Sequence, residues 1–406
     1  MVKSKTRSQN LKRVFILAGE PSGDRLAADL MAGLKLYFPT IEIHGVGGPL
    51  MVKEGLKVVY PYDELAIMGL FEVLKHYRHL VRLKNSIAHT IIRENYDLVI
   101  TVDSQDFSIR LAKELKVHKF SQPIIHYVLP TVWAWRANRI TKVKQFYDHI
   151  LYLFPFEKEI LDQNAISGSF VGHPITRLCQ STPKDYNTVI KSMRIDLDQD
   201  ILLILPGSRK SEFKRSVPVF SATVNQVLNA HPRFQPVVVL APNIVEYSNQ
   251  FTEQWSSSIK FFDPRLISSR QFDQYKMALF CTSKIALAMS GSVSLELAAS
   301  QTPMVIGYDF DNWFTRQIIK RMLLINTVTL VNLVSHSHSV PECLGTDFNS
   351  TQLSEELKKL IESQTCYQKQ LDSFKIVMEK LAFPMSDINY PAAEAIYQYC
   401  VNQDSG

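Results

Sequence analysis

The chain has 406 residues, a length that suggests about two domains, each large enough to bury its own core. Hydrophobic residues make up 46% of the sequence and charged residues 21%, which is typical of a folded globular protein and excludes a disordered, collagenous or coiled-coil chain. The net charge of +6 is too small to require nucleic acid, and we predict no nucleic-acid partner. It suits an anionic partner such as a phosphate or an acidic membrane surface.

The sequence gives no sign of a metal site, a disulfide framework or an export signal. Its five cysteines are scattered without a C-x-x-C pair, and His336 and His338 have no third ligand at metal spacing, so we predict no metal. The basic N-terminus precedes an apolar run, residues 14–18, that is too short for the core of a signal peptide. Because no run of about 18 apolar residues occurs, we expect a protein that is soluble or lies on a membrane surface.

Short β-branched apolar runs alternate with helical periodicity, which is the pattern of parallel strands joined by crossover helices. In the first half, strands are predicted at 14–18, 41–46, 98–102, 124–128, 150–154 and 170–171. After a polar stretch at 180–200 the series restarts, with strands at 201–205, 236–240, 259–262, 285–289 and 304–308. We therefore predict an α/β protein with two doubly wound, Rossmann-like domains, residues 1–180 and 181–384. The last helices are predicted at 352–362, 367–381 and 392–399, and we expect the segment 385–406 to complete the first domain.

Ligands of open α/β sheets bind beyond the carboxyl ends of the strands, so we expect the catalytic and ligand-binding residues in the loops there. The first such loop contains Glu20, Ser22, Gly23 and Asp24. Its glycines allow close backbone approach, and Ser22 or Asp24 could cap the following helix. The G-x-G-x-x-G spacing of a dinucleotide-binding loop is absent. The loop is a candidate ligand contact, and a turn chosen for its geometry alone explains it equally well.

Residues 66–84 have the pattern of a basic amphipathic helix. Such a helix can lie on anionic lipid. The side chains expected to touch lipid are Ile67, Met68, Leu70 and Phe71. Packing of the same apolar stripe against the sheet of the first domain is the commoner explanation of this pattern.

Two further segments of the first half carry candidate side chains. The strand at 98–102 is followed by Asp103 and Asp106, either of which could act as a general base or could instead cap the helix beginning near residue 108. The segment 127–139 contains Trp135 and Arg136, which could bind an amphiphile that carries phosphate. Aromatic core packing with solvated arginines is the alternative.

The second half has two loops suited to a nucleotide. Gly207, Ser208 and Arg209 bring backbone N–H groups, a hydroxyl and a guanidinium to one helix N-terminus, although the P-loop pattern is absent. Ser290, Gly291 and Ser292 could meet phosphate at the start of another helix, and Glu296 lies one turn further on, where its carboxylate could accept both hydroxyls of a ribose. The structural alternatives are an ion pair of Arg209 with Glu212, capping by Ser292, and an ion pair of Glu296.

Taken together, these segments resemble the lipid-A-disaccharide synthase family of bacterial glycosyltransferases. The residues that carry the resemblance are AGEPSGD (18–24), GVGGP (45–49), IMGLFEVL (67–74), DSQDF (103–107), IHYVLPTVWAWR (125–136), FPFE (154–157), FVGHP (170–174), LPGSR (205–209) and SGSVSLE (290–296). Departures from the family pattern include Pro21, Ser104-Gln105, the acidic segment 309–312 and the loop 335–339.

The resemblance implies a GT-B-type architecture, in which two Rossmann-like domains face each other across a cleft. It implies transfer of 2,3-diacylglucosamine from its UDP donor to 2,3-diacylglucosamine 1-phosphate, with a β-1,6 linkage, inversion, and no cofactor or metal. The expected place is the inner face of the bacterial cytoplasmic membrane, with an anionic membrane surface as partner.

The resemblance also implies the site residues. The expected base is Asp103, with Asp106 as its rival. Arg209, supported by Gly207 and Ser208, is expected to hold the diphosphate. Ser290 to Ser292 are expected to cap the diphosphate, Glu296 to bind ribose, and Asn332 to lie near the donor. The first loop, Trp135 and Arg136 are expected at the acceptor or the cleft.

Three other functions are alternatives to this expectation. A UDP-N-acetylglucosamine 2-epimerase would share the architecture and the nucleotide, but the basic amphipathic segment 66–84 favours a lipid substrate. A two-domain binding protein would usually carry an export signal, and an NAD-dependent oxidoreductase should carry the glycine fingerprint after its first strand.

Overall fold

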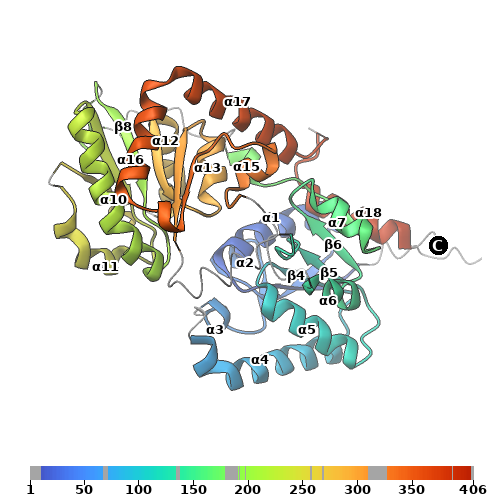
Figure 1. The fold of residues 1–406 in the computed structure, drawn as a ribbon. Helices are drawn as coiled ribbons and strands as arrows, with labels where there is room; N and C mark the ends of the chain where they lie inside the picture. The colour runs from blue at the N-terminus through green and yellow to red at the C-terminus, as the bar shows by residue number, and fades with distance from the viewer. Residues whose placement is uncertain are drawn as a thin grey trace, which may run out of the picture. The chain divides into compact units, whose positions relative to one another are not determined.

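A computed structural model describes residues 11–66, 72–133, 138–178, 191, 193–196, 198–256, 258–267, 269–309, 327–385 and 387–403. The chain divides into two compact units (Figure 1). The N-terminal unit comprises Met1–His173 and Phe383–Gly406, and the C-terminal unit comprises Pro174–Ala382. Each unit is built on one parallel sheet with helices around it, which confirms the predicted α/β class. No helix of the described part of the chain is long and apolar enough to cross a membrane.

The N-terminal unit has a sheet of seven strands in the order β3-β2-β1-β4-β5-β6-β7. The strands are β1 (Arg13–Ala18), β2 (Glu42–Val46), β3 (Lys57–Val58), β4 (Leu98–Val102), β5 (Ile124–Tyr127), β6 (His149–Tyr152) and β7 (Gly168–Phe170). The helices are α1 (Pro21–Tyr37), α2 (Pro49–Lys53), α3 (Asp63–Ala66), α4 (Glu72–Glu94), α5 (Gln105–Val117), α6 (Arg139–Phe146), α7 (Glu157–Gln163) and α18 (Pro391–Gln403).

The C-terminal unit has a sheet of six strands in the order β10-β9-β8-β11-β12-β13. The strands are β8 (Asp200–Leu205), β9 (Phe234–Val239), β10 (Lys260–Phe262), β11 (Ile285–Met289), β12 (Met304–Tyr308) and β13 (Glu342–Leu344). The helices are α8 (Ile175–Leu178), α10 (Lys210–Ala230), α11 (Val245–Ser248), α12 (Ser269–Thr282), α13 (Val293–Ala299), α15 (Leu330–Ser335), α16 (Ser350–Glu362) and α17 (Gln364–Leu381). Short 3₁₀ helices lie at Asn249–Gln254, Pro264–Leu266 and Gly345–Asp347.

In both sheets the first strand in chain order lies in the middle, and later strands are added first on one side and then on the other. The point where the side changes is the topological switch point of the sheet. In the N-terminal unit the switch point lies between β1 and β4, and in the C-terminal unit it lies between β8 and β11. The crevice beyond the carboxyl ends of two such strands is the usual ligand site of open α/β sheets. The fold therefore places the candidate ligand sites in the four loops that follow β1, β4, β8 and β11.

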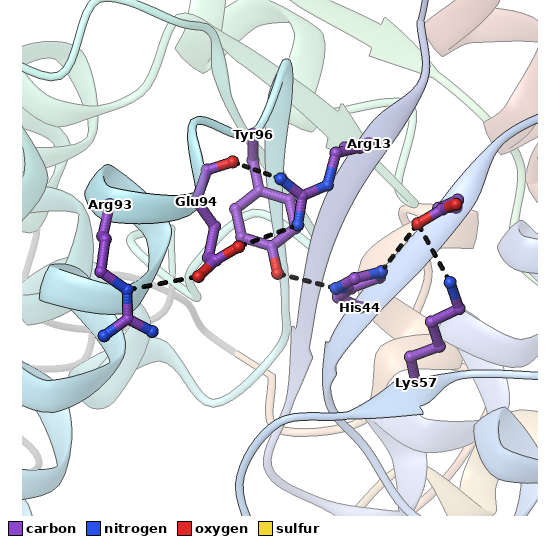
Figure 2. Close-up of polar contacts among 7 residues, drawn as sticks. Arg13, His44, Lys57, Arg93, Glu94 and Tyr96 are labelled. Carbon is purple, nitrogen blue, oxygen red and sulfur yellow. Dashed lines mark hydrogen bonds and ion pairs between the residues drawn. The ribbon is translucent and has the colours of Figure 1, made fainter.

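The amino ends of the first sheet are fastened by a polar network around Tyr96, which Figure 2 shows. The Tyr96 hydroxyl lies 2.9 Å from Nδ1 of His44 on β2, and the Arg13 guanidinium lies 4.9 Å from the centroid of the Tyr96 ring. Arg13 also pairs with Glu94 at 3.2 Å, so β1, β2 and the turn before β4 are joined at this end. The opposite end of the same strands carries the loops of the switch point.

Helix α4 extends the predicted amphipathic segment, because its apolar stripe continues beyond residue 84. Leu80, Leu83, Ile87 and Ile91 are buried in the core of the N-terminal unit. For Leu80, which belongs to the predicted stripe, the commoner explanation, packing on the unit's own sheet, is confirmed. The four predicted lipid contacts, Ile67, Met68, Leu70 and Phe71, lie outside the described residues.

The C-terminal helix α18 packs on α1 of the N-terminal unit. The rings of Tyr37 and Tyr397 stack with their centroids 5.1 Å apart. Gly33 allows the close approach, since a Cβ atom there would lie 2.6 Å from the Cβ atom of Ala393. The last helix of the chain is thus part of the same compact unit as the first.

Candidate active site

The loops after β1 and β4 meet at the switch point of the N-terminal unit. Ala18 and Val102, the last residues of these strands, are partners in the parallel pairing, so the two loops start side by side. The Ser22 hydroxyl donates to Oδ2 of Asp103 at 2.8 Å, and the Gly19 N–H donates to Oγ of Ser104 at 3.2 Å. The structure therefore joins two candidate residues that lie 81 positions apart in the sequence.

The backbone at Asp103 is held in a conformation that non-glycine residues rarely adopt. Asp103 has a φ of 53° and Ser104 a φ of 46°, both in the left-handed region. Such a conformation costs about 1–2 kcal/mol per residue and persists only where surrounding contacts hold it. The Asp103 N–H donates to the carbonyl of Tyr127 at 3.0 Å, and the Ser108 hydroxyl donates to the carbonyl of Asp103 at 2.9 Å. Strain of this kind gathers at functional sites.

Two expectations about helix caps in this region are wrong. Neither Asp103 nor Asp106 caps α5, because its N-cap residue is Ser104 and no side chain makes a capping bond there. Neither Ser22 nor Asp24 caps α1, whose N-cap is Glu20 and which starts with Pro21. Proline suits the first helical position, since its fixed φ is helical and no N–H is lost there.

Asp24 instead caps a different helix, α2. Its Oδ2 accepts from the N–H of Leu50 and its Oδ1 from the N–H of Met51, both at 3.0 Å. Asp24 is buried, and Gly48 leaves room for it, because a Cβ atom at position 48 would lie 2.6 Å from Oδ2 of Asp24. The described contacts of Asp24 therefore hold α2 in place.

The two candidate bases differ in their surroundings. Asp106 is 72% exposed and pairs with Arg139 at 2.6 Å, while Arg139 also donates to Gln105 at 3.0 Å. Asp103 is half-buried and has a hydroxyl as its side-chain partner. A carboxylate engaged by a guanidinium has less freedom to accept a proton from a substrate, so the geometry favours Asp103.

Trp133, at the edge of the predicted acceptor segment, is anchored by a buried carboxyl that the sequence did not single out. Its Nε1–H donates to Glu157 at 3.1 Å, and Glu157 also accepts from the N–H groups of Leu153 and Phe154. Burial raises the pKa of Glu157 to about 8, against the opposing effect of these donors. The FPFE motif thus has a structural role in holding Trp133. Trp135 and Arg136 lie outside the described residues.

The switch point of the C-terminal unit brings the LPGSR and SGSVSLE motifs to neighbouring strands. Gly207 has a φ of 104°, and a Cβ atom there would lie 2.9 Å from the Cβ atom of Glu212, so glycine is required on both grounds. Arg209 is the N-cap residue of α10 and pairs with Glu212 at 3.0 Å, as the structural alternative predicted. The Arg209 side chain nevertheless stays 78% exposed, and the Ser208 carbonyl is fixed by the Asn243 amide at 2.8 Å.

The loop after β11 is open to solvent at its tip. Gly291 and Ser292 are exposed, and a Cβ atom at Gly291 would meet nothing within 4 Å. Ser292 makes no side-chain capping bond, so that alternative is wrong. Glu296 pairs with Lys276 at 2.8 Å, which is the ion pair that the structural alternative predicted. Lys276 is a further cation at this site that the sequence did not single out.

The side chain of Asn332, which was expected near the donor, makes hydrogen bonds within the C-terminal unit. It is buried, its Nδ2 donates to the carbonyl of Val340 at 2.9 Å, and its Oδ1 accepts from the N–H of Val340 at 3.0 Å. Its amide also donates to Glu342 at 3.2 Å. These described bonds use both ends of the amide within the protein.

The side chains at the two switch points differ in their chemistry. The N-terminal switch point presents a carboxylate with a hydroxyl partner, which is suited to accepting a proton. The C-terminal switch point presents a guanidinium and the start of a long helix, which are suited to an anionic leaving group. Within the described ranges, no group of three or more His, Cys, Asp or Glu side chains could hold a metal ion.

Comparison with known proteins identifies the family. The family model described as lipid-A-disaccharide synthetase matches residues 14–396. The chain belongs to the lipid-A-disaccharide synthetase family. A lipid-A-disaccharide synthase of Ruegeria pomeroyi is 45% identical over 342 residues, which cover 84% of this chain and 84% of the relative. The chain is thus a glycosyltransferase of lipid A biosynthesis, as the motifs predicted.

Solved structures show the fold. A putative UDP-N-acetylglucosamine 2-epimerase from Listeria monocytogenes has a TM-score of 0.63 at 16% identity, covering 98% of this chain and 97% of its own. The UDP-GlcNAc 2-epimerase from Neisseria meningitidis, bound to UDP-GlcNAc, has a TM-score of 0.59 at 16% identity, covering 91% of this chain and 98% of its own. At this identity the likeness concerns architecture alone, and it agrees with the predicted GT-B-type fold of two Rossmann-like domains.

Proposed function

We propose that the chain transfers 2,3-diacylglucosamine from UDP-2,3-diacylglucosamine to 2,3-diacylglucosamine 1-phosphate. The product is the β-1,6-linked disaccharide, and UDP is released. Membership of the lipid-A-disaccharide synthetase family supports the reaction type. The observation that carries the proposal is the strained Asp103, bonded to Ser22 at the N-terminal switch point.

In the proposed mechanism Asp103 is the general base. The acceptor hydroxyl oxygen attacks the anomeric carbon of the donor while Asp103 takes the hydroxyl proton, and the bond between that carbon and the UDP oxygen breaks. One displacement inverts the anomeric carbon. A positioned base of this kind typically contributes a factor of about 100 to 10,000 in rate.

The C-terminal unit, with residues 181–384 as the donor domain, would bind UDP. Arg209 would neutralise the diphosphate as negative charge develops on it, and the N–H groups of Gly291 and Ser292 would bind its oxygens. Glu296 would accept the ribose hydroxyls, with Lys276 holding the carboxylate. The N-terminal domain, residues 1–180 with 385–406, would bind the acceptor. The Neisseria neighbour, which is bound to UDP-GlcNAc, supports a UDP-sugar donor.

We further propose that the protein works at the anionic inner face of the cytoplasmic membrane, because both substrates carry acyl chains. Arg78 and Arg82 on α4 are exposed, and α5, which lies beside α4 (Figure 1), adds the exposed Lys113. Exposed cations near an anionic membrane surface are attracted to it by about 1 kcal/mol each.

The decisive experiment is an assay of UDP release by the purified protein in detergent, with a chelator present. The donor is supplied with and without 2,3-diacylglucosamine 1-phosphate. Release that depends on the acceptor would support a transferase that needs no metal. No release with this pair, together with turnover of UDP-N-acetylglucosamine alone, would refute the proposal in favour of an epimerase or hydrolase.

A further inference from the structure

The carboxylate of Glu342, on the edge strand β13, accepts hydrogen bonds from a short loop of the C-terminal unit. The loop consists of Thr327, Val328 and Thr329, which we call the 327–329 loop. Glu342 accepts at Oε1 from the N–H of Thr329 at 2.9 Å and from the Thr327 hydroxyl, and at Oε2 from the N–H of Val328 at 3.2 Å. A single side chain therefore binds every residue of the loop.

The 327–329 loop in turn contacts the donor motif SGSVSLE. The Ser290 hydroxyl donates to the carbonyl of Val328 at 3.2 Å. Val328 is thus held on both sides, its N–H by Glu342 and its carbonyl by Ser290. The Ser290 N–H is fixed as well, because it donates to the carbonyl of Gly307 on β12 at 3.2 Å.

These bonds determine what Ser290 can offer a ligand. A serine hydroxyl has one proton, and here it is donated to Val328. Ser290 therefore orients the loop that follows β11, while Gly291 and Ser292, which are exposed, are left to face an anion. Val328 is therefore one of the contacts that hold Ser290, the residue directly before these two.

Glu342 is itself held in a rigid frame. Asn332 donates to Glu342 at 3.2 Å and makes a two-way bond with the backbone of Val340. Bonds to an ionised acceptor are about twice as strong as bonds between neutral groups, so a carboxylate suits four converging donors. The carboxylate and Asn332 form one structural connection between β13 and the loop.

We infer that Glu342 is a positioning residue of the donor site, which acts through Val328 and Ser290 to set the 290–292 loop for the diphosphate of the nucleotide. The inference deepens the proposed function and rests on it. Glu342 acts without touching the nucleotide, and its contribution is the placement of exposed backbone N–H groups.

The test compares UDP binding by wild-type protein and by E342Q, measured by calorimetry on the full chain. Glutamine has the same shape, but its NH₂ group would face the N–H of Val328 and break that one bond. We expect UDP affinity to fall about tenfold, which corresponds to the loss of one part-buried hydrogen bond to a charged group. E355Q, on the exposed face of α16 in the same unit, is the matched control and should bind UDP like wild type.

A double-mutant cycle with S290A separates positioning from general destabilisation. If Glu342 acts through Ser290, E342Q/S290A should bind UDP no more weakly than the weaker single variant. Wild-type affinity in E342Q, or additive losses in the double variant, would overturn the inference. If E342Q does not fold, T327V removes one donor to Glu342, and we expect a loss of about threefold that disappears in the S290A background. Absence of UDP binding by wild type would refute the proposed function itself.

Discussion

The hydroxyl of Ser22 and the carboxylate of Asp103 form a hydrogen bond of 2.8 Å between the loops that follow β1 and β4. The bond engages one oxygen of the Asp103 carboxylate at the switch point of the N-terminal unit. Gly23 brings the two loops together, because a Cβ atom there would lie 3.2 Å from the carbonyl of Val102. Both loops could be recognised in the sequence as candidate sites, but the hydrogen bond between them could not.

Replacing Ser22 by alanine should lower kcat about tenfold, the cost of one hydrogen bond to a charged group. The Asp103 carboxylate would lose its orienting donor while the fold keeps its packing. Steady-state kinetics with both substrates measure the effect, and we expect little change in the KM of the UDP donor. A tenfold rise in that KM at constant kcat would contradict the assignment of the loop to the base.

Asp103→Asn should lower kcat by a factor of at least about 100, because the amide cannot accept a proton. Asp106→Asn is the matched control, and it should retain most of the activity because Asp106 is exposed and paired with Arg139. UDP binding by Asp103→Asn should stay normal, which shows that the variant is folded. The reverse order of the two kcat values would move the base to Asp106.

Most of the fold could be predicted because buried parallel strands are continuous apolar runs. The predicted bounds of β4, β11 and β12 are those of the structure. The strands β3 and β13 were missed. β3 has only two residues, both exposed, and β13 has only three, so neither leaves an apolar run.

The site could be predicted as a set of loops, but not as a set of contacts. The residue types that suit a base or a phosphate site can be recognised in each loop, whereas hydrogen-bond partners far apart in sequence leave no local spacing. Asp24 is the clearest case, because the helix that it caps begins 25 residues later, at Pro49. Glu342 and Lys276 were missed for the same reason.

Replacing Asp24 by alanine should destabilise the N-terminal unit by about 1–3 kcal/mol. The change removes the buried carboxylate that accepts from the N–H groups of Leu50 and Met51, so both N–H groups lose their acceptor. Urea denaturation followed by circular dichroism measures the loss. Asp63→Ala, at an exposed position in the same unit, is the control and should change stability by less than about 0.5 kcal/mol. A wild-type midpoint for Asp24→Ala would show that the capping bonds contribute no net stability.

The contribution of the buried histidines to stability should fall in mild acid because they resist protonation, whereas the raised pKa of Glu157 acts in the opposite direction. Burial lowers the pKa of His126, His149 and His173 from 6.5 to about 4. Below pH 6.5 the unfolded chain binds protons at these positions while the folded chain does not. Their contribution is therefore complete above pH 6.5 and is lost as the pH falls from 6.5 to about 4.

The variant His126→Gln isolates one of these groups. His126 is fully buried on β5 and bonds through Nδ1 to the Thr101 hydroxyl at 2.7 Å, which a glutamine amide can replace. We expect the variant to be less stable than wild type at pH 8 but to lose less stability between pH 7 and pH 5, with a difference of about 1–2 kcal/mol. Urea denaturation across this range, with the exposed His118→Gln as control, measures both slopes. Parallel curves for wild type and His126→Gln would mean that His126 is protonated as readily in the folded chain as in the unfolded one.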